Sequence, residues 1–527
     1  VGGGGMAAID FFDRGWRCNP TGAAYIQDDR EYSFKEVGEL SCRVANALLS
    51  AGLPAGTKGA VWAVNDVTAW TCTLGLWRAN MCWIPVGARN SSEENHYVLD
   101  AFDCEVLFFQ KYFAPVIAEL QPTLPKIRHW VCVDGEAPEL AGSISLGEWI
   151  GDQPATRPTV AVDMDDVIML SSTGGTTGMP KGVMNTHRSL QTFCAHYTIA
   201  CTYKSEDKPV NLAAAPMTHT AGILSLPCTA RGGTVVVVTK PDPALLLAAI
   251  PKYKVTEMFL PPTVIYRLLD IPDLGKKVDF SSLRYFMYGA APMSVEKLKQ
   301  AIEVIGPVMM GGYGQTEAPA SISYLPPDAH FKNGRVADDE RLSSVGQPNP
   351  LISVEIMDDA NHILAQGETG EICVRGDLVM KGYYKAPEKT AETIIDGWLH
   401  TGDVGHIDAE GYLHITDRKK DMIISGGFNV YPSEVEQVIW GHPAVQDCAV
   451  IGVPDEKWGE AVKAVVELNK GQTVSADDLI ALCKEKLGSV KAPKSIDFID
   501  VLPRSPIGKV LKKDLRARYW QDAARKI

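Results

Sequence analysis

Short apolar runs alternate with helical patterns over most of the chain, and this alternation constrains the fold more than any other feature. Apolar or β-branched runs of four or five residues have the length of buried strands. Segments between them, such as 243–250 and 294–305, place apolar residues at helical spacing. Such alternation predicts α/β layering with largely parallel sheets. The expected strands are 60–64, 106–109, 130–133, 167–170, 235–238 and 257–260.

The pattern changes after about residue 350. Runs at 354–357, 371–374 and 412–415 are separated by turns containing Gly, Asp and Asn, which predicts a small antiparallel β unit. A smaller α/β pattern then returns toward the end of the chain. Its expected strands and helices are 422–424, 432–440, 448–453, 461–468 and 476–487.

A chain of 527 residues is too long for one ordinary core. We expect a large N-terminal domain at 6–416, built of layered α/β sheets plus the small β unit. A small, mobile α+β domain at 417–527 follows it. Residues 1–5 resemble a cloning scar ahead of a native Met6 and are left out of the fold prediction.

Composition and charge exclude several classes of protein. Lys and Arg number 51 against 64 Asp and Glu, a formal charge of −13, which argues against a nucleic-acid binder. No apolar run is long enough for a transmembrane helix, and the N-terminus lacks the regions of a signal peptide. The twelve cysteines form no CxxC pair, so thiols such as Cys72, Cys82, Cys194 and Cys201 are expected to be reduced and buried. A cytoplasmic protein without integral membrane contact is expected.

The loop 171-SSTGGTTGMPKG-182 follows one of the expected strands. Its glycines allow close backbone approach to an anion, Thr173, Thr176 and Thr177 offer hydroxyls, and Lys181 offers positive charge. We expect the arrangement strand, glycine-rich loop, helix. A Walker loop is excluded because proline precedes the lysine and glycine follows it.

Five further motifs follow in order: 313-YGQTE-317, 401-TGD-403, 417-DRKKD-421, 425-SGGFNVYPSEVE-436 and 503-PRSPIGKV-510. Trp398 precedes the second motif, whose carboxylate is expected in a tight turn. In this order and at these separations, the motifs resemble the adenylate-forming superfamily of acyl-CoA synthetases, luciferases and peptide-synthetase adenylation domains. The resemblance covers essentially the whole chain from about Met6.

The resemblance implies two half-reactions. A carboxylic acid reacts with ATP–Mg²⁺ to give acyl-AMP and pyrophosphate, and a thiol, usually that of coenzyme A, then displaces AMP. Thr173 and Glu317 are expected to hold Mg²⁺, and Thr176, Thr177 and Lys181 to bind the β- and γ-phosphates.

The resemblance also assigns the nucleotide site and the catalytic lysine. Lys509 would reach the carboxylate and the α-phosphate, Asp403 would accept hydrogen bonds from the ribose hydroxyls, and Tyr313 would stack on adenine. The other expected nucleotide contacts are Gly289, Ala290, Ala291, Gly312, Gly314, Gln315, Thr316 and Arg418.

Three features of the C-terminal region are expected to serve the second half-reaction. Lys420 lies at the family's hinge. Gly426 and Gly427 would let the pantetheine arm of coenzyme A pass close to the backbone. Trp458 lies where family members bring the small domain near coenzyme A.

The acid pocket is expected to be lined by His219, Thr220, Ala221, Tyr266, Gly311 and Ala318, with His219 at its mouth. Residues 216–226 contain no acidic side chain, which disfavours amino acids as substrates because their α-amino group needs a carboxylate partner. Small residues at this position suit an aryl, alicyclic or branched acid, and a medium-chain fatty acid fits equally well.

The leading interpretation is an AMP-forming acid–CoA ligase. No carrier domain follows Ile527, which favours free coenzyme A as the acceptor. Three alternatives stay open: an acyl-AMP ligase that delivers to a separate carrier protein, a luciferase-like oxidase, and a catalytically silent nucleotide sensor. The expected partners are a small carboxylic acid and coenzyme A without nucleic acid, and a homodimer is left open.

Overall fold

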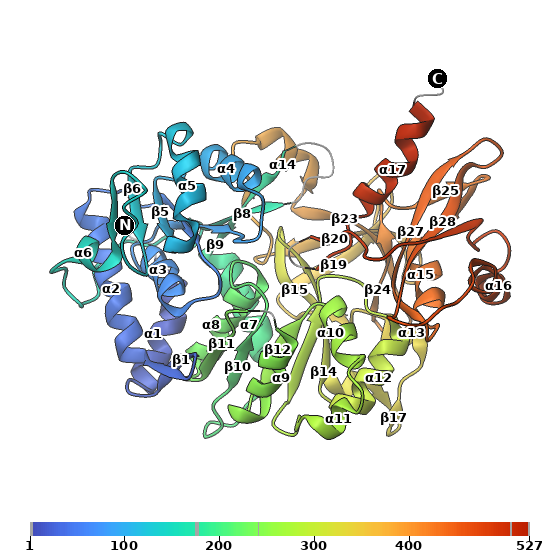
Figure 1. Ribbon diagram of the computed structural model, residues 1–527, viewed down its shortest axis with the longest axis horizontal. Coiled ribbons are helices and arrows are strands. Elements are labelled where there is room, and N and C mark those ends of the chain that lie inside the picture. The colour runs from blue at the N-terminus through green and yellow to red at the C-terminus, as the bar shows by residue number, and fades with distance from the viewer. Residues whose placement is uncertain (1–3, 174–178, 241, 506–507, 525–527) are drawn as a thin grey trace.

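The computed structural model describes residues 4–173, 179–240, 242–505 and 508–524. Two large sheets, one small sheet and a two-stranded hairpin of β16 Phe331–Lys332 and β17 Arg335–Val336 form an N-terminal part, and a further sheet forms a C-terminal unit from residue 423 onward. In Figure 1 the C-terminal unit, in orange and red, lies beside the green and yellow part of the chain. The mixed α/β fold predicted from the alternation is confirmed.

One large sheet has the strand order β18-β15-β14-β13-β12-β10-β11-β1-β2. Its six strands from β14 to β1 pair in parallel, and β2, β15 and β18 pair antiparallel at the edges. The bounds are β1 Ala23–Gln27, β2 Arg30–Ser33, β10 Val210–Ala213, β11 Thr234–Val237, β12 Glu257–Leu260, β13 Tyr285–Gly289, β14 Met309–Gln315, β15 Ala318–Leu325 and β18 Gln347–Pro348.

The other large sheet has the order β21-β9-β8-β4-β3-β5-β6-β7, and only β9 and β21 run antiparallel to their neighbours. Its strands are β3 Lys58–Trp62, β4 Cys82–Val86, β5 Val106–Phe109, β6 His129–Cys132, β7 Ser143–Ser145, β8 Val167–Thr173, β9 Lys181–Thr186 and β21 Gly382–Tyr383.

Helices cover both faces of each large sheet. Side chains alternate between the faces: Phe108 and Met287 point into the layer between the sheets, whereas Phe109 and Tyr288 point into the outer layers. The shared middle layer contains α1 Ile9–Cys18, α2 Phe34–Ser50, α3 Val67–Arg78, α7 His187–Ala200 and α8 Thr220–Ala230. The outer layers contain α4 Ser92–Ala101 and α5 Ala114–Leu120 on one side, and α9 Pro243–Lys252, α10 Pro262–Leu269 and α12 Val295–Ile305 on the other.

Several helices begin at a polar residue whose side chain accepts a hydrogen bond from a backbone N–H of the first turn. Such a cap satisfies one of the donors that a helix N-terminus leaves unpaired. Five examples are Ser33, Asp66, Ser91, Ser294 and Ser475. The local sequence therefore determines where these helices start.

The small sheet joins β19 Ile352–Met357, β20 Gly370–Gly376, β22 Ile394–Ile395, β23 Trp398–Ile407 and β24 Leu413–Arg418, all antiparallel as predicted. The C-terminal unit contains β25 Ile423–Ser425, β26 Phe428–Val430, β27 Val445–Asp455, β28 Gly459–Leu468 and β29 Ser495–Phe498. Its helices are α15 Pro432–Trp440, α16 Ala476–Leu487 and α17 Lys512–Ala524.

Two local predictions are wrong. The glycine-rich loop connects β8 to β9, which pairs antiparallel with β8, so it closes a hairpin rather than opening a helix. Residues 181–186 pair with β8 as a strand, and α7 begins only at His187. Asp403 lies within β23, opposite Arg418, and not in a tight turn.

All twelve cysteines are unpaired, and Cys72, Cys82, Cys194 and Cys201 are buried as expected. Among the helices that the structure describes, none combines the length and apolarity required to cross a bilayer.

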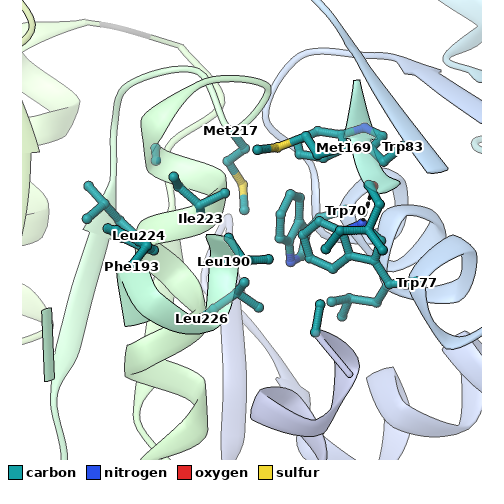
Figure 2. Packing of buried hydrophobic residues seen from close by; sticks show 14 of the residues in the cluster. Trp70, Trp77, Trp83, Met169, Leu190, Phe193, Met217, Ile223, Leu224 and Leu226 are labelled. Atoms are coloured by element: carbon teal, nitrogen blue, oxygen red, sulfur yellow. Dashed lines mark hydrogen bonds between the residues drawn. The ribbon is translucent and has the colours of Figure 1, made fainter. Parts of the chain in front are cut away.

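Three tryptophans anchor the layer between the two large sheets. Trp70, Trp77 and Trp83 meet edge to face with ring centroids 5.5–5.8 Å apart, a geometry that aromatic quadrupoles favour. The Trp77 indole N–H donates to the Ile168 carbonyl at 2.8 Å. Figure 2 shows the three rings among Met169 of β8, Leu190 of α7 and Met217, which lies in the turn before α8.

We expect Trp77→Ala to lower the free energy of unfolding by about 3–5 kcal/mol, because it leaves a large cavity in this layer. The measurement is denaturant unfolding followed by far-UV circular dichroism. Tyr112→Ala, at a site that is 83% exposed, is the control and should change stability little. Equal stability of the two variants would contradict the role given to the tryptophan cluster.

Candidate active site

The centre of the site lies where β13 and β14 end, since side chains at the carboxyl ends of parallel strands meet at one sheet edge. The backbones of β13 and β14 approach closely at this edge, and the residue that follows β13 is strained. A Cβ on Gly289 would lie 2.5 Å from the Gly312 carbonyl oxygen, so only glycine fits there. Ala290 has φ +67° and is exposed, a strained conformation of the kind that clusters at functional sites. Ala291 follows it, half-buried.

A buried carboxylate at Asp403 joins three elements at this edge. Asp403 is 4% exposed, accepts a hydrogen bond from the Tyr313 hydroxyl at 2.5 Å and pairs with the Arg418 guanidinium at 3.1 Å. Burial raises the pKa of Asp403, and the charge of Arg418 opposes this rise. The structure therefore brings Tyr313, Asp403 and Arg418 together, and gives Tyr313 a contact that the sequence did not predict.

A second carboxylate braces the backbone beside Asp403. Glu371 accepts a hydrogen bond from the Gly402 N–H at 3.0 Å through one oxygen, and its other oxygen lies 2.8 Å from His400 Nδ1. Cys373 faces His400 across the strand pair β20–β23. Glu371 therefore fixes the backbone conformation that presents Asp403.

Glu317 lies after β14 and is half-buried. It accepts a hydrogen bond from the Tyr383 hydroxyl at 3.2 Å, and the Lys181 ammonium lies 5.2 Å from the centroid of the Tyr383 ring. Burial raises the pKa of Glu317 and lowers the pKa of Lys181. Lys181 pairs with Thr173 across the β8–β9 hairpin. Thr176 and Thr177 lie outside the described residues.

This arrangement fits a hard divalent cation. Within the described ranges, Glu317 has no ion-pair partner within 4 Å, and its oxygens are of the kind that Mg²⁺ prefers. Thr173 has a hydroxyl on the strand that leads into the phosphate-loop sequence.

Two amides in the same region have unused acceptors. Gln315 donates to the Thr401 carbonyl, and Asn185 donates to the Thr316 carbonyl. Among the residues with assigned positions, Gln315 Oε1 and Asn185 Oδ1 are buried and lack a hydrogen-bond donor. A buried acceptor without a partner is costly, so these oxygens are suited to donors from a ligand. Gly314 cannot carry a side chain, since its Cβ would meet the Ala320 backbone.

The expected acid-pocket residues divide between two layers. Ala221 and Ala318 are buried in the layer between the large sheets, and His219 and Thr220 lie at the start of α8. His219 is accessible to solvent but crowded by protein, and this desolvation lowers the pKa of its imidazole to about 4. The imidazole of His219 is therefore uncharged at neutral pH.

Tyr266 does not lie with this group. It is 2% exposed in the outer layer between α10 and α12, and its hydroxyl accepts a hydrogen bond from the Ser294 N–H at 2.7 Å. The expected pocket role of Tyr266 is therefore not supported. Gly311 and Gly312 lie on β14 between the two layers, because a Cβ on Gly311 would face Tyr288 and one on Gly312 would face Met287.

The C-terminal unit carries Lys509, and the Gly508 carbonyl just before it accepts a hydrogen bond from the Thr263 hydroxyl at 3.3 Å. Thr263 lies in the first turn of α10, just after β12, so the residue before Lys509 is held at this edge of the large sheet. Lys509 is accessible to solvent but crowded by protein; this desolvation and the charge of Arg418 lower the pKa of its ammonium, and Asp403, Asp421 and Glu317 oppose the shift. Lys420 is exposed in the turn after β24, at the entrance to the C-terminal unit.

Gly426 and Gly427 form the two-residue turn between β25 and β26, with φ +58° and +83°. Positive φ at both positions is the type I′ geometry that favours glycine. Trp458 lies over this turn: its carbonyl accepts the Gly426 N–H at 2.9 Å, and a Cβ on Gly426 would meet its ring at 2.6 Å. The structure therefore brings the three residues expected near coenzyme A together.

Comparisons with known proteins agree with this geometry. The model of the AMP-binding enzyme family matches residues 12–384, and the model of the AMP-binding enzyme C-terminal domain matches residues 434–509. Feruloyl-CoA synthase of an Amycolatopsis species is 34% identical over 506 residues, 95% of this chain and 97% of that protein. Medium/long-chain-fatty-acid–CoA ligase FadD8 of Mycobacterium tuberculosis is 41% identical over 380 residues, 70% of this chain and 65% of that protein.

A solved structure, ATP-bound MatB from Rhodopseudomonas palustris, superposes with a TM-score of 0.86 at 29% identity, covering 98% of this chain and 99% of that one. The chain belongs to the AMP-binding enzyme family, the adenylate-forming superfamily.

Sequence reasoning missed several residues of this region. Glu371, His400 and Tyr383 reach the site through pairing between strands that are distant in the chain. No local spacing reveals such contacts. The apolar runs predict that these strands exist, but not which residues face each other.

We expect Glu371→Ala to raise the KM for ATP about tenfold, because it removes the acceptor that holds the Gly402 backbone beside Asp403. Glu371→Gln retains one acceptor oxygen and should restore most of the affinity. The measurement is a steady-state titration of ATP for each variant. An unchanged KM for Glu371→Ala would show that Asp403 is positioned without this brace.

Proposed function

We propose that this protein is an AMP-forming acid–CoA ligase. The observation that carries the proposal is the buried pair of Asp403 and Arg418 beside Tyr313 at the end of β14, with Glu317 just after the same strand and Gly508, the neighbour of Lys509, bonded to Thr263 at the start of α10. A protein that only senses a nucleotide would not need Lys509, because this lysine is expected to act on the reacting carboxylate and α-phosphate.

The first half-reaction joins the acid to AMP. A carboxylate oxygen of the acid attacks the α-phosphorus of ATP, a new P–O bond forms, and the bond to the β-phosphate breaks so that pyrophosphate leaves. Lys509 carries the positive charge that stabilises the carboxylate and the α-phosphate oxygens as charge develops. Asp403 accepts hydrogen bonds from the ribose hydroxyls, and Tyr313, Gly289, Ala290 and Ala291 bound the adenine site.

Glu317 and Thr173 would hold Mg²⁺, with Lys181, Thr176 and Thr177 near the β- and γ-phosphates. When bound, Mg²⁺ neutralises phosphate oxygens and makes pyrophosphate a better leaving group. The residues of the chain orient the nucleotide so that the acid approaches opposite the leaving pyrophosphate.

In the second half-reaction a thiolate attacks the acyl carbon and AMP leaves with the former carboxylate oxygen. We propose that the C-terminal unit, with a boundary near residue 417, turns at Lys420 to bring Gly426, Gly427 and Trp458 to the cleft. The thiol is that of coenzyme A, by analogy with the CoA ligases among the relatives. Delivery to a carrier protein is the second candidate.

The acid is apolar and aryl, alicyclic or medium-chain. His219 is uncharged and Ala221 and Ala318 are small and buried, so a site lined by these residues would favour an apolar group over a charged one. The relatives named above differ in their acids, one being a feruloyl and the other a fatty-acid ligase.

The proposal is tested by acid-dependent ATP–pyrophosphate exchange with ferulate, cyclohexanecarboxylate and octanoate, followed by AMP release with coenzyme A. Exchange with at least one acid and CoA-dependent turnover support the ligase. Exchange without CoA turnover favours the carrier-dependent enzyme, and no exchange with any acid of the three classes contradicts the proposal.

We expect Lys509→Met to slow exchange by about 10²–10³-fold while ATP binding, measured by calorimetry, changes little. The reason is that Lys509 acts on charge that develops only as the acid attacks. Lys513→Met, an exposed lysine on α17, is the matched control. Exchange that proceeds at the wild-type rate without Lys509 would remove the residue from this role.

A further inference from the structure

The C-terminal unit is docked on the N-terminal part through polar contacts between α12 and α15. The Gln437 side-chain amide, on α15, donates to the Met293 carbonyl at 2.9 Å and accepts from the Val295 N–H at 3.1 Å. Val295 is the first residue of α12, so its N–H has no carbonyl partner within the helix. Gln437 therefore satisfies a donor that this helix leaves free.

Lys297 makes the second contact from α12. Its ammonium donates to the Gln446 carbonyl at 2.9 Å and the Val445 carbonyl at 3.3 Å, at the start of β27. It also lies 4.5 Å from the centroid of the Tyr266 ring, whose position in this layer is thereby explained. Across the described part of the chain, no carboxylate lies within salt-bridge distance of Lys297, so these carbonyls and the ring are its partners.

A third contact lies beside the catalytic lysine. The Thr263 hydroxyl, on α10, donates to the Gly508 carbonyl at 3.3 Å. Gly508 has φ +87°, and a Cβ there would come within 2.7 Å of the Thr263 oxygen. Close approach of α10 therefore requires glycine immediately before Lys509.

We propose that Lys297 and Gln437 form a latch that selects the orientation of the C-terminal unit in which Lys509 faces the nucleotide cleft. The α12–α15 latch consists of these two side chains and the backbone groups of Met293, Val295, Val445 and Gln446 that they bind. Both side chains are positioning residues, since neither lies among the residues assigned to ATP or the acid. The latch must break when the unit turns for thioester formation, so its strength sets the balance between the two half-reactions.

The test separates the half-reactions in the Lys297→Met variant. Methionine keeps an apolar stem against Tyr266 and removes the charged donor. Loss of the contacts to two carbonyls should slow ATP–pyrophosphate exchange about tenfold. Thioester formation from the chemically synthesised adenylate of the best acid in the panel should be unchanged or faster. Equal loss in both half-reactions, or no loss in exchange, would overturn the proposal.

Lys299→Met is the matched control, two residues along the same helix. Lys299 pairs with Glu296 at 3.3 Å and Asp339 at 2.7 Å, both in the N-terminal part, so its loss should alter neither half-reaction. If both lysine variants changed the rates of the half-reactions to a similar extent, the effect would come from a general disturbance of α12, and the latch would be contradicted.

A second readout does not depend on catalysis. Because the Val295 amide is protected by Gln437, its hydrogen exchange reports separation of the C-terminal unit. In Lys297→Met this amide should exchange about tenfold faster, and in Lys299→Met at the wild-type rate. The inference rests on the proposed function only for the first readout. If the wild type activates no acid, the proposed function fails. If hydrogen exchange of the Val295 amide is the same in Lys297→Met as in the wild type, the latch alone is overturned.

Discussion

The buried pair of Asp403 and Arg418 is the interaction on which the arrangement of the site depends. A carboxylate that is 4% exposed is tolerated only with partners, and Arg418 and Tyr313 supply them from β24 and β14. These contacts tie the small antiparallel sheet to the end of a large parallel one. Glu371 then holds the adjoining backbone, so the position of Asp403 is determined from both sides.

The same pair also connects the site to the C-terminal unit. Arg418 is the last residue of β24, and the turn with Lys420 follows directly before β25. The rotation proposed at this turn would leave Asp403 in place while moving Lys509, which belongs to the C-terminal unit. Under the proposed function, the fold separates the groups that would hold the nucleotide from the lysine that would act on the reacting atoms.

Much of the fold could be predicted because the information is local. The strands at 106–109 and 257–260 and the helices at 432–440 and 476–487 have the predicted bounds, since apolar spacing and capping residues determine them. The β8–β9 hairpin was missed because a glycine-rich loop precedes a helix or a strand equally well. Only the pairing of Thr173 with Lys181 distinguishes the two.

The site likewise contains residues that local motifs predict and residues that only the three-dimensional contacts reveal. Glu317, Asp403 and Lys509 were predicted from motifs whose order resembles a known family, and the structure places Asp403 beside Tyr313 on β14 and Glu317 just after that strand. Tyr266 was assigned to the acid pocket, yet it packs beneath Lys297 in the outer layer. The contacts of Glu371, Lys297 and Gln437 join residues about thirty to 150 positions apart, and nothing in the spacing of a single chain reveals such pairs.

The most direct measurement of the central claim follows an oxygen atom through the reaction. The enzyme is supplied with ATP, Mg²⁺, coenzyme A and an acid carrying oxygen-18 in both carboxylate positions, and the products are weighed by mass spectrometry. Attack on the α-phosphorus predicts AMP that contains one atom of oxygen-18 and pyrophosphate that contains none. Unlabelled AMP, or label in phosphate or pyrophosphate, would contradict the formation of an acyl-adenylate at this site.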